Sequence, residues 1–352
     1  MTCYNPRLRV EDKFKWATAL DGHKYHPATI TGTKNLEQLD YYFSAGHYKI
    51  YPIKCQECIG CRLDYAREWA NRAYLESLYY KQNYFVTLTY DDNNITLLDE
   101  IETPDEFTFV KEDLKDIIEW EGTLVPKELQ DFMKRLRINM ERKYGQNGPI
   151  RMMACGEYGT RTKRPHYHLI IFNLQLPADS FYDPKIKWEK YTYYHNSIIE
   201  EAWGKGFVDV TEASWNTMAY VARYITKKIN GKKSDLHYGI QGQQKEFFRV
   251  SNRPGIGWQY YQDHKEKIYK HDKIMIVNNK GTHYVRPPKY YDDMYELENP
   301  KHMKEIKEQR RIQSINQLRI KDTTTSLTRW EQLQVEKSTK ENKAIALQRP
   351  LE

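Results

Sequence analysis

Apolar residues recur at helical spacing in two long segments of the chain. In residues 62–81 and 127–144 they return every three or four positions, which places them along one face of an amphipathic helix. The second segment runs into Gly-Gln-Asn-Gly-Pro at 145–149, a composition that ends helices. Shorter helices are predicted at 195–203 and 214–228. Each of these helices has an apolar face that needs a surface to cover.

Short runs rich in β-branched and aromatic residues alternate with the helices. They predict strands at 84–90, 150–157, 164–172 and 207–210. The turn-like residues 158–165 join the second and third strands into a hairpin. This order predicts an α+β fold, in which helices flank a central antiparallel sheet with ferredoxin/RRM-like connections.

The pattern divides the chain into four parts. Residues 1–82 form a cysteine-containing N-terminal element and a helix, and residues 83–231 form the core. Residues 232–299, where the periodicity loosens, are a C-terminal extension. Residues 300–352 are polar and charge-mixed, and we expect a partly helical, marginally ordered tail there.

Composition places the chain among intracellular proteins that meet phosphates. Its 352 residues carry a net charge of +7, a mild basic bias. Some of the 29 tyrosines are expected to stack on unpaired bases. With neither a signal peptide nor an apolar run of membrane length, the sequence predicts a cytoplasmic protein without a membrane partner.

Basic residues gather in two places that flank the hairpin and the last core helix. We expect both groups to contact DNA phosphates. The residues are Arg161, Lys163 and Arg164 in the first group, and Lys227, Lys228, Lys232 and Lys233 in the second.

Two histidines one residue apart lie on the third strand. The side chains of His166 and His168 project from the same sheet face. If Glu157 pairs with His166 across the hairpin, a carboxylate joins the two imidazoles in an N/N/O triad suited to Mg or Mn. The competing interpretation is structural, with alternating histidines on a half-buried strand and a solvated glutamate at its end.

Tyr220 and Tyr224 are four residues apart and therefore share one face of the helix at 214–228. A phenol with a pKa of about 10 becomes a useful nucleophile beside a metal-polarised phosphate and a cation, which Lys227 or Lys228 can supply. The alternative is that the aromatic pair simply packs in the core.

Five cysteines, an odd number, indicate a reduced protein rather than a disulfide scaffold. The spacing Cys55-x-x-Cys58-x-x-Cys61 predicts a structural zinc site. An iron–sulfur cluster is disfavoured, because Tyr65 stands where a ferredoxin pattern has its next cysteine. The fourth zinc ligand is expected to be Cys3, or else His23, His26 or His47.

Together these segments resemble the three motifs of HUH endonucleases. More narrowly, they resemble the replication initiators of microviruses, above all the gokushoviruses, over roughly residues 1 to 260. The segments that carry the resemblance are Phe85–Thr89, Gly156–Gly159, Arg164–His168, Tyr220–Lys228, Cys55–Arg62 with an early Cys3, and Ser251–Gly257.

The resemblance implies an HUH endonuclease fold for the core and a nickase and ligase of rolling-circle replication. His166 and His168 would be metal ligands with Glu157 as the third, and Tyr220 and Tyr224 the paired nucleophiles. The family's lysine corresponds to Lys227 or Lys228. Implied partners are single-stranded or origin DNA and the bacterial host's replicative helicase and polymerase, with Mg or Mn as cofactor.

Two rival functions stay open. Another HUH enzyme, a relaxase or a single-strand transposase, would share the chemistry, although the tyrosine pair disfavours single-tyrosine versions. The other is a non-catalytic module that binds single-stranded nucleic acid, with a sheet that presents Tyr167 to bases and a zinc knuckle at the cysteines.

Overall fold

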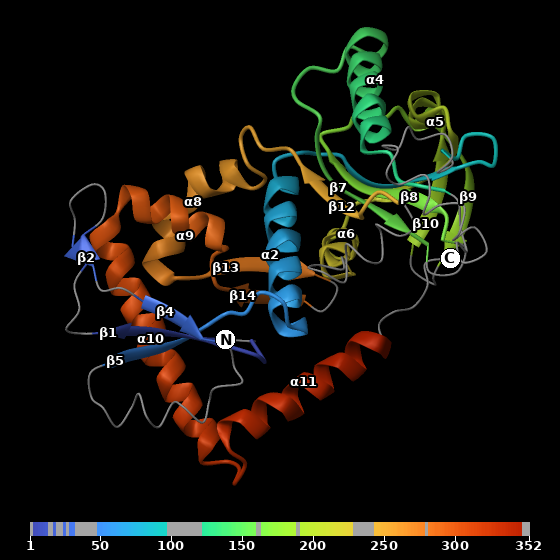
Figure 1. Ribbon diagram of the computed structural model, residues 1–352. Coiled ribbons are helices and arrows are strands. Elements are labelled where there is room, and N and C mark those ends of the chain that lie inside the picture. Colours follow the sequence, from blue (N-terminus) through green and yellow to red (C-terminus); the bar gives the residue numbers. More distant parts are fainter. Residues whose placement is uncertain are drawn as a thin grey trace, which may run out of the picture. The chain divides into compact units, whose positions relative to one another are not determined.

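Figure 1 shows a computed structural model of the chain, which describes residues 3–12, 17–18, 24–25, 28–31, 48–96, 122–159, 163–187, 191–227, 243–278 and 281–346. The chain forms two compact units. The first unit combines residues 1–65 with 304–349, and the second unit comprises residues 66–303.

A seven-stranded sheet, antiparallel throughout, organises the second unit, in the order β12-β7-β8-β6-β11-β10-β9. The predicted α+β fold with a central antiparallel sheet is therefore confirmed. The strands are β6 (Asn83–Tyr90), β7 (Arg151–Tyr158), β8 (Pro165–Phe172), β9 (Phe181–Lys187), β10 (Tyr191–Asn196), β11 (Gly206–Glu212) and β12 (Phe247–Val250).

Four of these strands have the ferredoxin-like connection that the sequence predicts. Along the chain the order is β6, α4 (Pro126–Tyr144), β7, β8, α5 (Ser197–Trp203) and β11. In the sheet, β8 lies between β6 and β7, and β6 lies between β8 and β11. This interleaved order is that of a ferredoxin-like unit, which β9, β10 and β12 extend at the two edges.

Helices cover both faces of the sheet. Helices α4 and α5 lie on one face and α6 (Trp215–Lys227) on the other (Figure 1). Because side chains alternate along a strand, β8 sends Leu169 and Ile171 into the core beneath α4 and α5, and Ile170 toward α6. His166 and His168 share the α6 face, as the predicted site requires.

Helix α6 is fixed at its start and along its buried side. The Thr217 hydroxyl accepts from the Ser214 backbone N–H at 2.8 Å, and the Ser214 hydroxyl accepts from the Thr217 N–H at 3.3 Å, a reciprocal cap. Further along, Ala222 packs against Ala66 and Ala70 of α2 (Ile59–Ser77). These small side chains let the two helices approach closely.

The segment at residues 251–257 is held by a buried ion pair. The Arg151 guanidinium donates to Glu76 at 2.6 Å and to the Pro254 carbonyl at 2.7 Å. The other Glu76 oxygen accepts from the Gly257 N–H at 2.7 Å. The remaining elements of the second unit are α8 (Trp258–His271), β13 (Ile274–Asn278), β14 (Gly281–Val285) and α9 (Lys289–Glu298).

The first unit contains a three-stranded antiparallel sheet in the order β4-β1-β5, together with the start of α2 and most of α10. Its further elements and their bounds are β1 (Arg7–Asp12), β2 (Ala17–Thr18), β3 (Lys24–Tyr25), β4 (Ala28–Thr31), β5 (Tyr48–Ile53), α10 (Pro300–Asp322) and α11 (Arg329–Ala346). None of the helices in the described ranges is long and apolar enough to cross a membrane.

Three strands of the large sheet were absent from the prediction. Strand β9 contains Pro184 and charged residues and forms one edge, and β10 lies next to it. Strand β12 has four residues, forms the opposite edge, and lies beyond the predicted end of the core at 231. An edge strand has one paired neighbour, so its sequence carries a weaker apolar pattern than a central strand.

The expected marginal order of the tail from residue 300 is wrong over residues 300–346. Helices α10 and α11 occupy nearly all of this stretch. Ile306 and Leu333 are buried, and the Glu308–Arg311 ion pair lies three residues apart along α10. Sparse apolar anchors and short-range charge pairs stabilise these helices, although the overall composition is that of a solvated tail.

Candidate metal centre and tyrosine pair

The hairpin of β7 and β8 brings Glu157 against both histidines. In the ladder, Glu157 pairs with His166, the register that the sequence analysis required. One carboxylate oxygen of Glu157 lies 3.2 Å from His166 Nε2 and 2.9 Å from His168 Nε2. Ligand atoms of the three residues all lie within 4.8 Å of one another, so this group could hold a metal ion.

This group is buried at one end and open at the other. The side chains of Glu157 and His168 are 4% and 5% exposed, and that of His166 is 14% exposed. Burial raises the pKa of Glu157, but hydrogen bonds from His166 and His168 outweigh it and lower that pKa to about 2. Glu157 is therefore an ionised carboxylate at neutral pH, the form that binds a cation.

The ring of His168 is held from the neighbouring strand β6. Thr87 is the cross-strand partner of His168, and its hydroxyl lies 3.0 Å from His168 Nδ1. The Phe85 ring stacks on the same imidazole with centroids 5.7 Å apart. Sequence reasoning treated β6 as an ordinary core strand and missed both roles. The only available signal was that Phe85 and Thr87 share a face.

Both tyrosines of α6 pack on the imidazole of His168. The His168 ring centroid lies 5.2 Å from that of Tyr220 and 5.3 Å from that of Tyr224. The two phenol rings are 5.0 Å apart, and the Tyr224 hydroxyl donates a short hydrogen bond to the Tyr220 hydroxyl. The structure thus brings together two phenols, two imidazoles and one carboxylate on one sheet face.

The environment keeps both phenols protonated. Burial, and after it the negative charge of Glu157, raises the pKa of Tyr220 and of Tyr224. A neutral phenol is a poor nucleophile, so reaction at this site depends on positive charge brought next to the carboxylate.

The predicted basic residues lie only partly in the described part of the chain. Lys163 is exposed in the hairpin turn, and Arg164 donates to the Tyr90 carbonyl at 2.7 Å and pairs with Asp92. Arg164 therefore ties the hairpin to the end of β6. Outside the described residues lie Arg161, Lys228, Lys232, Lys233 and the side chain of Lys227.

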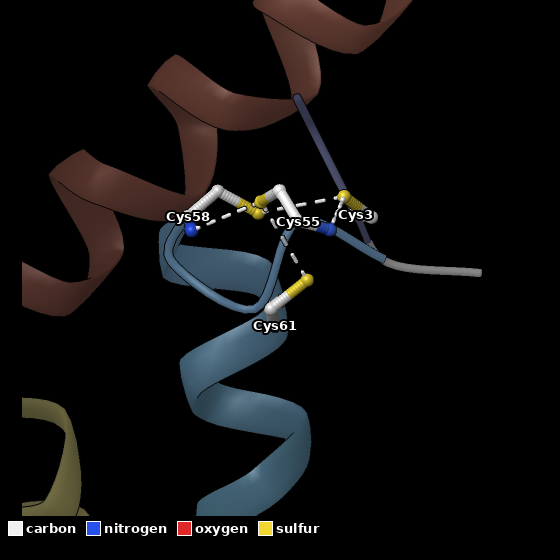
Figure 2. A group of neighbouring side chains, drawn as sticks. All are labelled: Cys3, Cys55, Cys58 and Cys61. Carbon is white, nitrogen blue, oxygen red and sulfur yellow. Dashed lines mark hydrogen bonds between the residues drawn. The ribbon is translucent and has the colours of Figure 1, made fainter. Parts of the chain in front are cut away.

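The structure also brings Cys3 to the three cysteines of the predicted zinc motif. All four are buried, and their sulfur atoms lie within 4.8 Å of one another, so they too could hold a metal ion (Figure 2). The alternative ligands His23, His26 and His47 lie outside the described residues.

Tyr167 is not available as a platform for bases. Its side chain is fully buried beneath α4 and α5, and its hydroxyl hydrogen-bonds with Tyr90 at 2.7 Å and accepts from the Val125 N–H at 2.9 Å. The suggestion that the sheet presents Tyr167 to nucleic acid is wrong, because the helices cover that face.

Similarity to known proteins establishes the family. The family model for the replication-associated protein ORF2 matches residues 83–229. Replication-associated protein ORF2 of Spiroplasma virus 4 is 35% identical over 247 residues, which are 70% of this chain and 68% of that protein. The chain belongs to this family of replication-associated proteins. The predicted relationship to phage replication initiators is thereby confirmed.

Other members of the family are more distant. Replication-associated protein VP4 of Bdellovibrio phage phiMH2K is 29% identical over 254 residues, 71% of this chain and 69% of that protein. ORF4 of Chlamydia phage 1 is 25% identical over 272 residues, 74% of this chain and 60% of that protein. No solved structure matches. The segment matched by the family model includes Glu157, both histidines and both tyrosines, whereas the four clustered cysteines lie before it.

Proposed function

We propose that the chain initiates rolling-circle replication by nicking single-stranded origin DNA and later rejoining its ends. One observation carries this proposal. Two phenols with a mutual hydrogen bond pack on His168, whose Nε2 faces the carboxylate of Glu157. A core role alone explains aromatic rings at these positions, but not their placement on a convergent Glu-His-His group. Membership of a replication-associated family supports the same conclusion.

The donor set of this group fits a divalent ion. Two imidazole nitrogens and one ionised carboxylate oxygen converge, and the more exposed side of His166 leaves an approach for a phosphate. Such a set suits Mn, and Mg is held by its carboxylate with water. A bound ion would withdraw negative charge from a non-bridging phosphate oxygen.

The reaction itself is a transesterification in which one phenol replaces one alcohol. The oxygen of Tyr220 or Tyr224 forms a bond to phosphorus and loses its proton to solvent. The bond from phosphorus to the 3′ oxygen breaks, and that oxygen takes up a proton. The products are a free 3′ hydroxyl and a 5′-phosphotyrosine, so neither a nucleotide triphosphate nor an oxidant is consumed.

The second tyrosine makes the cycle repeatable. Because the hydroxyls of Tyr220 and Tyr224 are hydrogen-bonded to each other, a phosphate that reaches one is next to the other. After host helicase and polymerase have copied a circle, the free phenol cuts the regenerated origin. The released 3′ hydroxyl then attacks the first phosphotyrosine, which closes a single-stranded circle.

A strand-transfer assay tests this proposal. Stem-loop oligonucleotides tiled over the genome that encodes the chain are incubated with the protein and Mn²⁺, and covalent adducts are counted in denaturing gels. We expect Tyr220→Phe/Tyr224→Phe to form none, and the matched control Tyr191→Phe, a partly buried tyrosine that packs in the same core beside α6, to form as many as wild type. Adducts from the double variant would contradict the proposal.

The single variants separate the rival functions. With a substrate that carries two origin copies, Tyr220→Phe or Tyr224→Phe should each still nick but release no closed circle. A single-tyrosine HUH enzyme would lose everything with one variant and nothing with the other. A non-catalytic binding module would shift the oligonucleotides in native gels and leave all of them uncut.

A further inference from the structure

The four clustered cysteines come from three places in the first unit. Cys3 precedes β1, Cys55 and Cys58 lie in the turn before α2, and Cys61 lies in its first turn. Figure 2 shows their sulfur atoms pointing toward a common centre. None of these residues belongs to the tyrosine site, so the cluster needs its own explanation.

The spacing of the sulfur atoms is that of ligands around one ion. The Sγ atoms of Cys55 and Cys61 are 4.0 Å apart, and so are those of Cys58 and Cys3. Four sulfurs held at about 2.3 Å from a tetrahedral zinc ion are about 3.8 Å from one another. A disulfide would instead bring one pair to about 2.05 Å. All four cysteines are free thiols.

The backbone around the cluster is arranged for negative sulfur. The N–H groups of Tyr4, Cys55 and Cys58 point at Cys58, Cys3 and Cys55 respectively, each at 3.3 Å from the sulfur. Cys58 and Cys61 also lie at the N-terminus of α2, where the helix dipole favours anions. Donors aimed at sulfur and a positive helix end stabilise thiolates, and thiolates are the form that binds metal.

The first unit has little else to hold this region together. Among its described residues, the buried apolar side chains besides the cysteines are Tyr4, Val10, Ile306 and Leu333. Two of these, Tyr4 and Leu333, pack directly on the cysteines. A core of this size is small for a unit that spans more than 100 residues of sequence, and such units commonly rely on a metal cross-link.

We infer that Cys3, Cys55, Cys58 and Cys61 bind one zinc ion in a closed, structural site. The ion ties the first residues of the chain to the start of α2, and Leu333 of α11 covers it. Zinc fits better than an iron–sulfur cluster, because sulfurs in mutual contact leave space for a single small ion and none for bridging sulfides. This inference is independent of the nicking activity.

Metal analysis and X-ray absorption on the full-length wild-type protein test the inference directly. After dialysis against EDTA, we expect one zinc per chain, with four sulfur neighbours at about 2.3 Å. This measurement needs no variant, so a folding defect cannot obscure it. Nitrogen or oxygen neighbours, iron in place of zinc, or loss of all metal on dialysis would overturn the assignment.

Variants then locate the ion. Cys58→Ser should lose the zinc, whereas Cys155→Ser, which replaces the buried fifth cysteine in β7, should keep all of it. His166→Ala/His168→Ala should also keep one zinc, which separates this ion from any metal at the histidines. On removal of zinc with a mercurial, the amides of Tyr4 and Cys55 should exchange hydrogen faster. Retention of full zinc by Cys58→Ser would contradict the inference.

Discussion

Replacing Thr87 by valine tests how the histidine site is held. The Thr87 hydroxyl lies 3.0 Å from His168 Nδ1 and can either donate to that nitrogen or accept from it. It donates when Nε2 carries the proton and faces Glu157, and it accepts when Nε2 turns its lone pair to a metal. Valine has nearly the same shape and can do neither, so the ring loses its support in both states.

The expected magnitude follows from that one hydrogen bond. A buried hydrogen bond contributes about 0.5–1.5 kcal/mol net, and loss of a partner behind a metal-binding histidine lowers metal affinity about 10- to 100-fold. We therefore expect the Kd for Mn²⁺ of Thr87→Val to rise by about tenfold. The nicking rate at limiting Mn²⁺ should fall by a similar factor, and high Mn²⁺ should restore it.

Calorimetric titration with Mn²⁺ and nicking rates measured across Mn²⁺ concentrations provide the two readouts. Thr211→Val is the matched control, because Thr211 is buried in the adjacent strand β11 and, among the described residues, makes no hydrogen bond to either histidine. It should bind Mn²⁺ like wild type. An unchanged Kd for Thr87→Val, or a defect that saturating Mn²⁺ leaves in place, would refute the role assigned to this hydroxyl.

Three further variants probe the site and its support. Glu157→Gln removes the negative ligand, so Mn²⁺ binding by calorimetry should disappear, and retained binding would count against the N/N/O set. Glu76→Gln leaves the buried Arg151 unpaired and should lower the free energy of unfolding in urea by about 3–5 kcal/mol, against about 0–1 kcal/mol for the exposed control Glu308→Gln; equal losses would contradict this. Gly257 has φ +79°, and a Cβ there would lie 2.8 Å from a tyrosine hydroxyl, so Gly257→Ala should cost about 1–3 kcal/mol in the same assay, and wild-type stability would refute the strain.

The central sheet and its site were predictable because each element carries a strong local pattern. The apolar stripe that ends at Gly145 predicted α4, and the alternation around His166 and His168 placed both imidazoles on one face. The facing register of Glu157 followed from the length of the hairpin turn. These features depend on neighbours in sequence, which is why sequence reasoning can reach them.

Long-range packing was out of reach for the same reason. Thr87 supports His168 only because β6 and β8 pair in one register, and a shift of a single residue would turn the hydroxyl to the other face. The contact of Leu333 with the cysteines joins positions far apart in the chain. Cys3 could be proposed as the fourth cysteine ligand from composition, but only the fold brings it to the other three.

Mapping the DNA-linked residue by mass spectrometry tests the central claim most directly. Trypsin cleaves after Arg223, between the two tyrosines, so Gly206–Arg223 contains Tyr220 as its sole tyrosine and Tyr224–Lys227 contains only Tyr224. After incubation with cleaved origin DNA and Mn²⁺, we predict a nucleotide adduct on one or both of these peptides. An adduct on any other peptide, or strand cleavage that leaves no covalent adduct, would contradict the account.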